Sequence, residues 1–259
     1  MNARCATLPL FIAMLTSPAS SYAAAAACAA ASGSTVPAVV ELYTSEGCDS
    51  CPPADRWVSS LKAEAAKGKV IPLAFHVDYW DYIGWKDRFA DPAFGARHRE
   101  AAGRGGASVV YTPQVLVDGR EYQQWRRTSG DKFAAASPKP ARAELRVAVA
   151  PAGTQLRLTL TGRTAQPVHG AQAWIALYEN GLSTDVKAGE NKGVMLHHDF
   201  VVRRWLGPFA FDGSGLNVMQ SLVPPAGSVI AQSGIAVVAV DDSGSILQAV
   251  TLPLRDCPG

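Results

Sequence analysis

The stretch that decides the fold is residues 36–55, which read VPAVVELYTSEGCDSCPPAD. Residues 36–43 are mostly apolar and include several β-branched side chains, which predicts a buried strand. A turn at residues 44–47 leads to Cys48 and Cys51, and apolar residues recur at helical spacing after them. The sequence therefore predicts that a C-x-x-C motif opens a helix directly after a strand.

The position of the two cysteines predicts redox chemistry. Backbone N–H groups in the first turn of a helix have no intrahelical partner, and together with the positive helix end they stabilise a thiolate. We therefore expect Cys48 to be the exposed, more acidic thiol that attacks a disulfide. Cys51 lies one turn further on, within reach to resolve the mixed disulfide.

The next segments continue an alternation of strands and helices. Residues 69–79 predict a second strand and residues 92–103 a second helix, which gives β-α-β-α order. Residues 109–122 then predict two strands joined by a tight Asp-Gly turn. Pro113 stands at the start of this hairpin, one of the few places where a sheet accepts proline.

A strand, a C-x-x-C motif, a helix and a later Thr-Pro pair resemble the thioredoxin fold. That resemblance implies that the Thr112–Pro113 bond is cis and that the proline packs against the disulfide. More specifically, the chain resembles a secreted family called domain of unknown function 1223. The matching motifs are VELYTSEGCDSCPPAD at 40–55, FHVDYWDYIGWKD at 75–87, YTPQVLVDG at 111–119, GEN at 189–191 and HHDFVVR at 197–203. The family implies a thioredoxin-like fold and an exported location, but no substrate.

The same resemblance assigns the site. Cys48, Cys51 and Pro113 are the predicted catalytic residues. Thr112 and Tyr111 directly precede this proline, and we expect both to contribute to the surface that contacts the substrate.

Two further elements are candidates for the site. Trp80 and Trp85 lie in segment 78–85, after the second predicted strand, where open α/β sheets bind ligands. They either contact apolar segments of a partner protein or pack the loop itself. Glu41 in the first strand is a candidate for proton transfer beneath the cysteines, with a position at the sheet edge or pairing with an arginine as the alternative.

The histidines give little support for a metal site. His76 and Asp78 share one face of the second strand, but we identify no third ligand. His197 and His198 are adjacent, so in a strand they point to opposite faces, and we interpret them as a strand-surface pair. The chain also has no second C-x-x-C motif of the kind that completes a zinc site. We therefore predict neither a metal nor another cofactor.

Charge and hydropathy argue against a nucleic-acid partner and against a membrane span. The 259 residues carry a net charge of +2 without any block of like charge, which argues against a nucleic-acid partner. Beyond residue 30 no apolar run is long enough to cross a membrane, so we expect no transmembrane span in the mature chain. The expected partners are thiols or disulfides of proteins or small molecules. The sequence does not indicate an oligomeric state.

Residues 1–31 have the pattern of a signal peptide and an alanine-rich leader. Arg4 supplies the positive start, residues 8–15 are apolar, and small residues with several A-x-A sites follow. We therefore expect export to the periplasm or the medium, where cysteines usually pair. A lipoprotein anchored at Cys28 is the alternative. If cleavage precedes Cys28, it remains with Cys257 as an even pair at the two ends, and we expect these two to form a disulfide.

The second half of the chain predicts a different module. We expect a thioredoxin-like domain over residues 32–136 and an antiparallel β-sandwich over residues 137–259. Short strands with alternating apolar residues, separated by Gly, Pro and Asp turns, support the sandwich. Its loop at residues 182–193 is longer than a hairpin turn, which is typical of a functional or docking element.

The sequence thus favours an exported thiol–disulfide oxidoreductase. The alternatives are an exported binding protein whose C-x-x-C disulfide is only structural, and a metal chaperone that uses the two thiols. Asp49 and Glu46 flank Cys48, and no basic residue lies between Thr44 and Asp55. Because carboxylates oppose the formation of a nearby thiolate, we expect a weak oxidant rather than a strong one.

Overall fold

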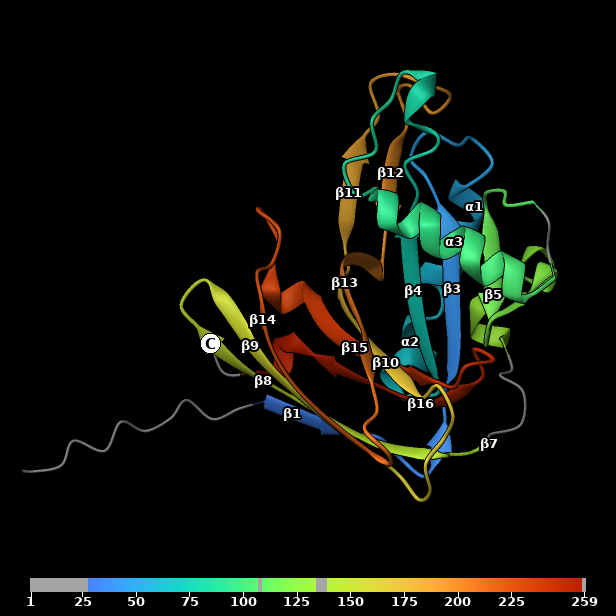
Figure 1. Ribbon diagram of the computed structural model, residues 1–259. Coiled ribbons are helices and arrows are strands. Elements are labelled where there is room, and N and C mark those ends of the chain that lie inside the picture. Colours follow the sequence, from blue (N-terminus) through green and yellow to red (C-terminus); the bar gives the residue numbers. More distant parts are fainter. Residues whose placement is uncertain (1–27, 107–108, 134–138, 258–259) are drawn as a thin grey trace, which may run out of the picture.

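The computed structural model describes residues 28–106, 109–133 and 139–257 (Figure 1). This part of the chain is mostly β, with several sheets and few helices. Most of the expected leader, residues 1–27, lies outside the described residues. Residues 28–31, which we assigned to the leader, instead form strand β1 (Cys28–Ala31). Among the described residues, no helix is long and apolar enough to cross a membrane.

One mixed sheet of eight strands runs through the molecule, in the order β16-β15-β10-β13-β4-β3-β5-β6. Strand β3 pairs in parallel with β4 and antiparallel with β5, and β6 pairs antiparallel with β5. The strands are β3 (Ala38–Thr44), β4 (Val70–His76), β5 (Gln114–Val117), β6 (Arg120–Glu121), β10 (Gln172–Glu179), β13 (Val201–Ala210), β15 (Ser233–Val240) and β16 (Ile246–Pro253). Every residue of β3 and β4 is buried, as expected for apolar strands in the centre of a sheet.

Helices cover both faces of this sheet near β3. They are α1 (Pro52–Ser59), α2 (Lys62–Ala66) and α3 (Pro92–Arg104). Tyr43 of β3 stacks on His98 of α3, with ring centroids 4.0 Å apart. The next residue, Thr44, donates a hydrogen bond of 3.0 Å to Asp55 of α1. Because successive strand residues point to opposite faces, α1 and α3 lie on opposite sides of β3.

A second sheet packs on the other half of the first. Its order is β1-β8-β9-β14, with β8 (Ala143–Ala152), β9 (Gln155–Thr164) and β14 (Gly215–Leu222). Alternate residues of β8, such as Leu145 and Val147, are buried against Ile175 of β10 and Ile235 of β15 in one apolar core. The alternating apolar residues predicted from the sequence therefore pack in a hydrophobic core between the two sheets.

Short elements complete the described chain. Two further strand pairs are β2 (Thr35–Val36) with β7 (Lys139–Pro140), and β11 (Leu182–Asp185) with β12 (Met195–His198). The short 3-10 helices are η1 (Asp81–Ile83), η2 (Gln123–Arg126), η3 (Gly130–Lys132), η4 (Ile230–Gln232) and η5 (Leu254–Asp256). Figure 1 shows the β11–β12 hairpin at the same end of the molecule as the start of α1.

The two halves of the chain share the eight-stranded sheet. Strand β13 joins β4 in parallel, with Val201 opposite Ala74, and the Ala74 amide donates a 2.8 Å hydrogen bond to the Phe200 carbonyl. The pairing satisfies backbone groups along an edge of β4 that would otherwise be exposed. Apolar alternation identifies strands but not their neighbours, so the sequence did not predict this junction. The expected boundary between residues 136 and 137 lies outside the described residues.

A disulfide joins the two ends of the described chain. Cys28 of β1 is bonded to Cys257, with 5.1 Å between their Cα atoms and 229 residues of sequence separation. This is the pairing that the sequence predicts.

We expect that Cys28→Ser with Cys257→Ser lowers the free energy of unfolding. In the chain-entropy model, a loop of 229 residues corresponds to about 5 kcal/mol. Urea denaturation of the wild-type and double-variant proteins measures the difference, and each single variant should match the double one. An unchanged denaturation midpoint, or a free Cys257 thiol in the mass spectrum of the exported protein, would contradict this prediction.

Candidate functional site

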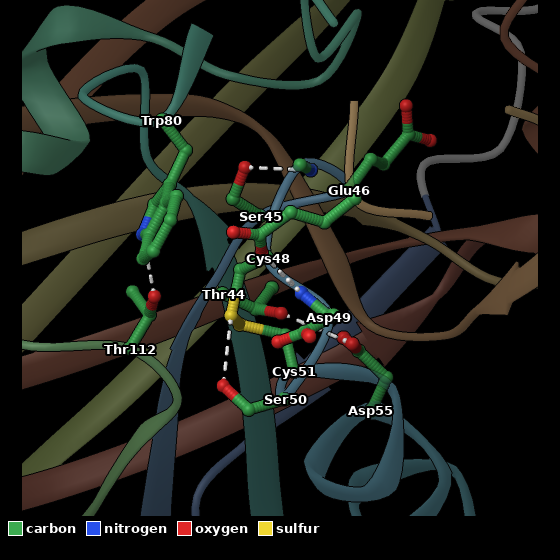
Figure 2. Close-up of a disulfide and its surroundings, with 12 residues drawn as sticks. Thr44, Ser45, Glu46, Cys48, Asp49, Ser50, Cys51, Asp55, Trp80 and Thr112 are labelled. Atoms are coloured by element: carbon green, nitrogen blue, oxygen red, sulfur yellow. Dashed lines mark hydrogen bonds between the residues drawn. A yellow bond between two sulfur atoms is a disulfide. The ribbon is translucent and has the colours of Figure 1, made fainter. Parts of the chain in front are cut away.

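The C-x-x-C motif forms a disulfide in the loop between β3 and α1 (Figure 2). The Cα atoms of Cys48 and Cys51 are 5.4 Å apart. Cys51 directly precedes α1, whose first two residues are Pro52 and Pro53. Proline suits this position because the first N–H groups of a helix lack intrahelical partners. The motif therefore lies at the helix start, as the sequence predicts.

Both cysteines are fully buried, with 0% exposure. Our expectation that Cys48 is exposed is therefore wrong for the disulfide form. The cover is the loop between β11 and β12, residues 186–194, which comes from the second half of the chain. Asn191 donates two hydrogen bonds of 2.9 Å, to the carbonyl oxygens of Glu46 and Cys48. Glu190 accepts a 3.1 Å hydrogen bond from the backbone N–H of Asp49.

Aromatic side chains enclose another side of the disulfide. Trp80 donates a 2.6 Å hydrogen bond from Nε1 to Oγ1 of Thr112, and Figure 2 shows both residues beside the cysteines. Trp85 donates a 2.9 Å hydrogen bond from Nε1 to Glu46. Both tryptophans are half-buried. Because each donates a hydrogen bond to a different segment, they hold the loops of the site together. Tyr82, which stacks on Trp80, is 82% exposed and presents an apolar surface to solvent.

The segment at residues 111–113 has the peptide geometry that the sequence predicts. The Thr112–Pro113 peptide bond is cis, as the thioredoxin resemblance implies. Pro113 is buried, Thr112 is half-buried and Tyr111 is 38% exposed. The hydroxyl group of Tyr111 donates to Glu121 rather than to any group of the disulfide loop.

Glu41 does not lie beneath the disulfide. It forms an ion pair with Arg97 of α3 and accepts a hydrogen bond from Tyr43. These contacts are on the α3 face of β3, whereas the C-x-x-C motif begins the helix on the opposite face. The alternative that we expected, pairing with an arginine, is the one found, and Glu41 is not positioned to move protons at the cysteines.

A different group of buried ionisable side chains lies behind the disulfide loop. It consists of Glu46, Asp55, His76, Asp87 and His198, none more than 6% exposed. His76 Nδ1 lies 2.7 Å from Asp87 Oδ2. His198 lies between two carboxylates, with Nε2 3.5 Å from Glu46 Oε1 and Nδ1 3.6 Å from Asp55 Oδ1. We call these five residues the buried polar cluster.

Charges in this cluster shift the ionisation of its members. Burial disfavours the imidazolium form of His198, but the carboxylates of Asp55 and Glu46 outweigh it and raise the pKa of His198 to about 10. Burial likewise opposes ionisation of Asp87, yet His76 and the backbone N–H groups of Glu46 and Phe89 hold the pKa of Asp87 below its usual value. The cluster therefore keeps charged groups in the interior by mutual attraction.

Sequence reasoning missed most of this cluster. His197 is exposed and His198 is 2% exposed, so the interpretation of both as a strand-surface pair was wrong for His198. Exposed and buried side chains do alternate along β12. The sequence did not indicate that α1 covers the face on which His198 lies. The one sequence signal that pointed to His198 was the HHDFVVR motif at residues 197–203, which resembles the family. The family resemblance assigns no role to the residues of this motif.

One family model and two solved structures match parts of the chain. The family model described as "Protein of unknown function (DUF1223)" matches residues 39–240. The crystal structure of protein AGR_C_4864 from Agrobacterium tumefaciens is similar at 26% identity and a TM-score of 0.56, covering 86% of this chain and 97% of that one. A domain of the outer membrane lipoprotein Omp28 from Porphyromonas gingivalis matches at 12% identity and a TM-score of 0.27, covering 44% of this chain and 88% of that one. No curated protein matches the chain.

We expect that Asn191→Ala makes the Cys48–Cys51 disulfide easier to reduce. Two hydrogen bonds of about 1 kcal/mol each hold the covering loop, so their loss favours opening by roughly 5–30-fold. The rate of reduction by dithiothreitol, followed by alkylation and mass spectrometry, measures the effect. Lys192→Ala, an exposed neighbour in the same loop, is the matched control and should leave the rate unchanged. Equal rates for Asn191→Ala and wild type would show that the loop is no barrier.

Proposed function

The chain belongs to the protein family of unknown function DUF1223, and we propose that it is an exported thiol–disulfide oxidoreductase with a thioredoxin-like domain. The observation that carries the proposal is the disulfide between Cys48 and Cys51 at the start of α1. A C-x-x-C motif at a helix start within a βαβ unit is typical of redox enzymes of this class. The signal-peptide pattern predicted over residues 1–31 supports export to a compartment where such chemistry operates.

The strand order supports the thioredoxin-like assignment. From β3 to β6 the chain follows the order β-α-α-β-α-β-β, in which α1 and α2 together form the first crossover, and β4-β3-β5-β6 are adjacent in the sheet. The cis Thr112–Pro113 bond directly precedes β5. This is the arrangement that the resemblance to thioredoxin implies, and it leaves the other four strands of the sheet as an extension.

The proposed reaction transfers two electrons. The Cys48 thiolate attacks one sulfur of a substrate disulfide, which forms a mixed disulfide and releases the first substrate thiolate. The Cys51 thiolate then attacks the Cys48 sulfur, releasing the second substrate thiolate and leaving the Cys48–Cys51 disulfide. Because Cys48 is buried, the loop at residues 186–194 must move before a substrate can reach it.

The small number of hydrogen-bond donors near Cys48 favours a weakly oxidising disulfide. Pro52 and Pro53 have no backbone N–H, so the first turn of α1 offers a thiolate fewer donors than an ordinary helix. The amide of Asp49 already donates to the Glu190 carboxylate. The hydroxyl of Ser50 lies 3.3 Å from Cys48 Sγ and can donate a hydrogen bond to a thiolate there. A poorly stabilised thiolate disfavours the reduced form, so the protein is suited to reduction or isomerisation.

The complete burial of both cysteines favours a second candidate. In this alternative, the protein is an exported binding protein and the disulfide only braces the loop before α1. The two candidates differ in reduction potential, because structural disulfides resist reduction by the glutathione pool.

We expect that Cys48→Ser abolishes reduction of a model protein disulfide, such as that of insulin. Cys51→Ser should instead accumulate mixed disulfides with substrates, because the resolving thiol is missing. Turbidity of reduced insulin measures the first effect, and mass spectrometry of non-reduced samples measures the second. Lys192→Ala, at an exposed position, is the control that leaves the C-x-x-C pair and the fold intact. Activity that survives Cys48→Ser would rule out the proposed role of this thiol.

We expect that Asp49→His lowers the pKa of Cys48 and makes the protein more oxidising. The substitution replaces a neighbouring negative charge with a group that can carry a positive one. Thiolate absorbance against pH measures the pKa, and equilibration with glutathione measures the potential. An exchange of charge elsewhere on the surface, Glu144→His, is the control. If the potential of Asp49→His equals that of wild type, the local charge argument is wrong.

A further inference from the structure

We propose that Asp55, His76 and His198 bind a divalent transition-metal ion, best fitted by Zn²⁺, behind the disulfide loop. Each residue offers one ligand atom, and these atoms all lie within 4.8 Å of one another. The residues come from α1, β4 and β12, so the site forms only where both halves of the chain meet. The proposal does not depend on the redox chemistry of the cysteines.

Unsatisfied nitrogen atoms point to a ligand at this place. His76 Nε2 and both ring nitrogens of His198 are buried without a hydrogen-bond partner, as is Glu46 Oε1. His76 is 0% exposed and His198 is 2% exposed, so bulk water does not satisfy these atoms. Buried polar atoms without partners are costly and rare in folded proteins. A metal ion would bind one nitrogen of each ring, His76 Nε2 and His198 Nδ1, where it replaces a proton on His198 and leaves Nε2 facing Glu46.

The spacing of the three ligand atoms, all within 4.8 Å of one another, approaches that of ligands around an ion. His198 Nδ1 and Asp55 Oδ1 are 3.6 Å apart, which is too far for a direct hydrogen bond. Two ligands at about 2.0–2.1 Å from a tetrahedral zinc ion are separated by about 3.3–3.4 Å. The observed separation needs only a small inward movement to reach this value. His76 Nε2 is the ligand on the third side, because its Nδ1 already faces Asp87.

Each histidine also has a carboxylate behind it. Asp87 Oδ2 lies 2.7 Å from Nδ1 of His76, and Glu46 Oε1 lies 3.5 Å from Nε2 of His198. Metal-bound histidines almost always donate their second N–H to such a group, which fixes the orientation of the ring. Asp55 is held similarly, because its second oxygen accepts the hydrogen bond from Thr44. His76 and Asp55 are therefore oriented by neighbours, and His198 would need a small movement to donate from Nε2 to Glu46.

The chemistry of the ligands selects the kind of ion. Two imidazoles and one carboxylate suit zinc and similar first-row ions, whereas Ca²⁺ and Mg²⁺ prefer sets made of oxygen atoms alone. Three carboxylates are buried in the cluster, from Glu46, Asp55 and Asp87. A divalent cation offsets part of this negative charge in a place where unpaired charge is expensive. Three protein ligands leave the fourth tetrahedral position open.

The test is zinc titration of the purified, untagged protein with its Cys48–Cys51 disulfide intact. We expect one Zn²⁺ per chain, measured by calorimetry against a chelator of known affinity. Co²⁺ should give the absorbance of a tetrahedral site without a thiolate band, because no sulfur takes part. Failure of the oxidised, folded wild-type protein to bind either ion would overturn the proposal. A site that forms only after reduction would overturn it as well, since the two thiols would then be the ligands.

Variants identify the ligands. Asp55→Asn, which keeps an oxygen for Thr44, and His198→Gln should abolish stoichiometric binding. Asp87→Asn should weaken binding by about 10–100-fold, because it removes a group that orients His76. His197→Gln, the exposed neighbour on the same strand, is the matched control and should bind as wild type does. Binding that survives in folded Asp55→Asn and His198→Gln proteins, checked by circular dichroism, would contradict the assignment.

Discussion

The pairing of β13 with β4 is the constraint on which the rest of the structure depends. A single parallel contact, Val201 opposite Ala74 with the bond from the Ala74 amide to the Phe200 carbonyl, joins the sheet of the first half to that of the second. The β11–β12 hairpin directly precedes β13, so this junction also fixes where the hairpin lies. It brings Asn191 over the disulfide and His198 behind it. Without this pairing, the C-x-x-C motif would lie on an open surface.

Covering the disulfide has two opposing consequences. Hydrogen bonds from Asn191 stabilise the closed loop, and the same loop buries Cys48. Any molecule that reacts with Cys48 therefore requires local opening of this loop. The exposed ring of Tyr82 stacks on the half-buried Trp80, whose indole N–H donates to Thr112.

Much of the first half could be predicted from the sequence, whereas the assembled site could not. The apolar run before Cys48 predicts β3, and the prolines after Cys51 predict the helix start, because both signals are local. The burial of Cys48 depends on Asn191, which lies 143 residues further along the chain. Glu41 lies in the strand before the cysteines and was a candidate for proton transfer, with pairing to an arginine as the alternative. The sequence did not identify its partner, Arg97, which comes from α3. Pairings over such distances are not encoded in local periodicity.

The reduction potential of the Cys48–Cys51 pair tests the central claim most directly. Equilibration of the wild-type protein with glutathione buffers, with alkylation of free thiols at each ratio, gives the value. The account predicts a potential between about −200 and −270 mV, in the range of reductases and isomerases. A value below about −300 mV would mark the disulfide as structural and contradict the proposed oxidoreductase.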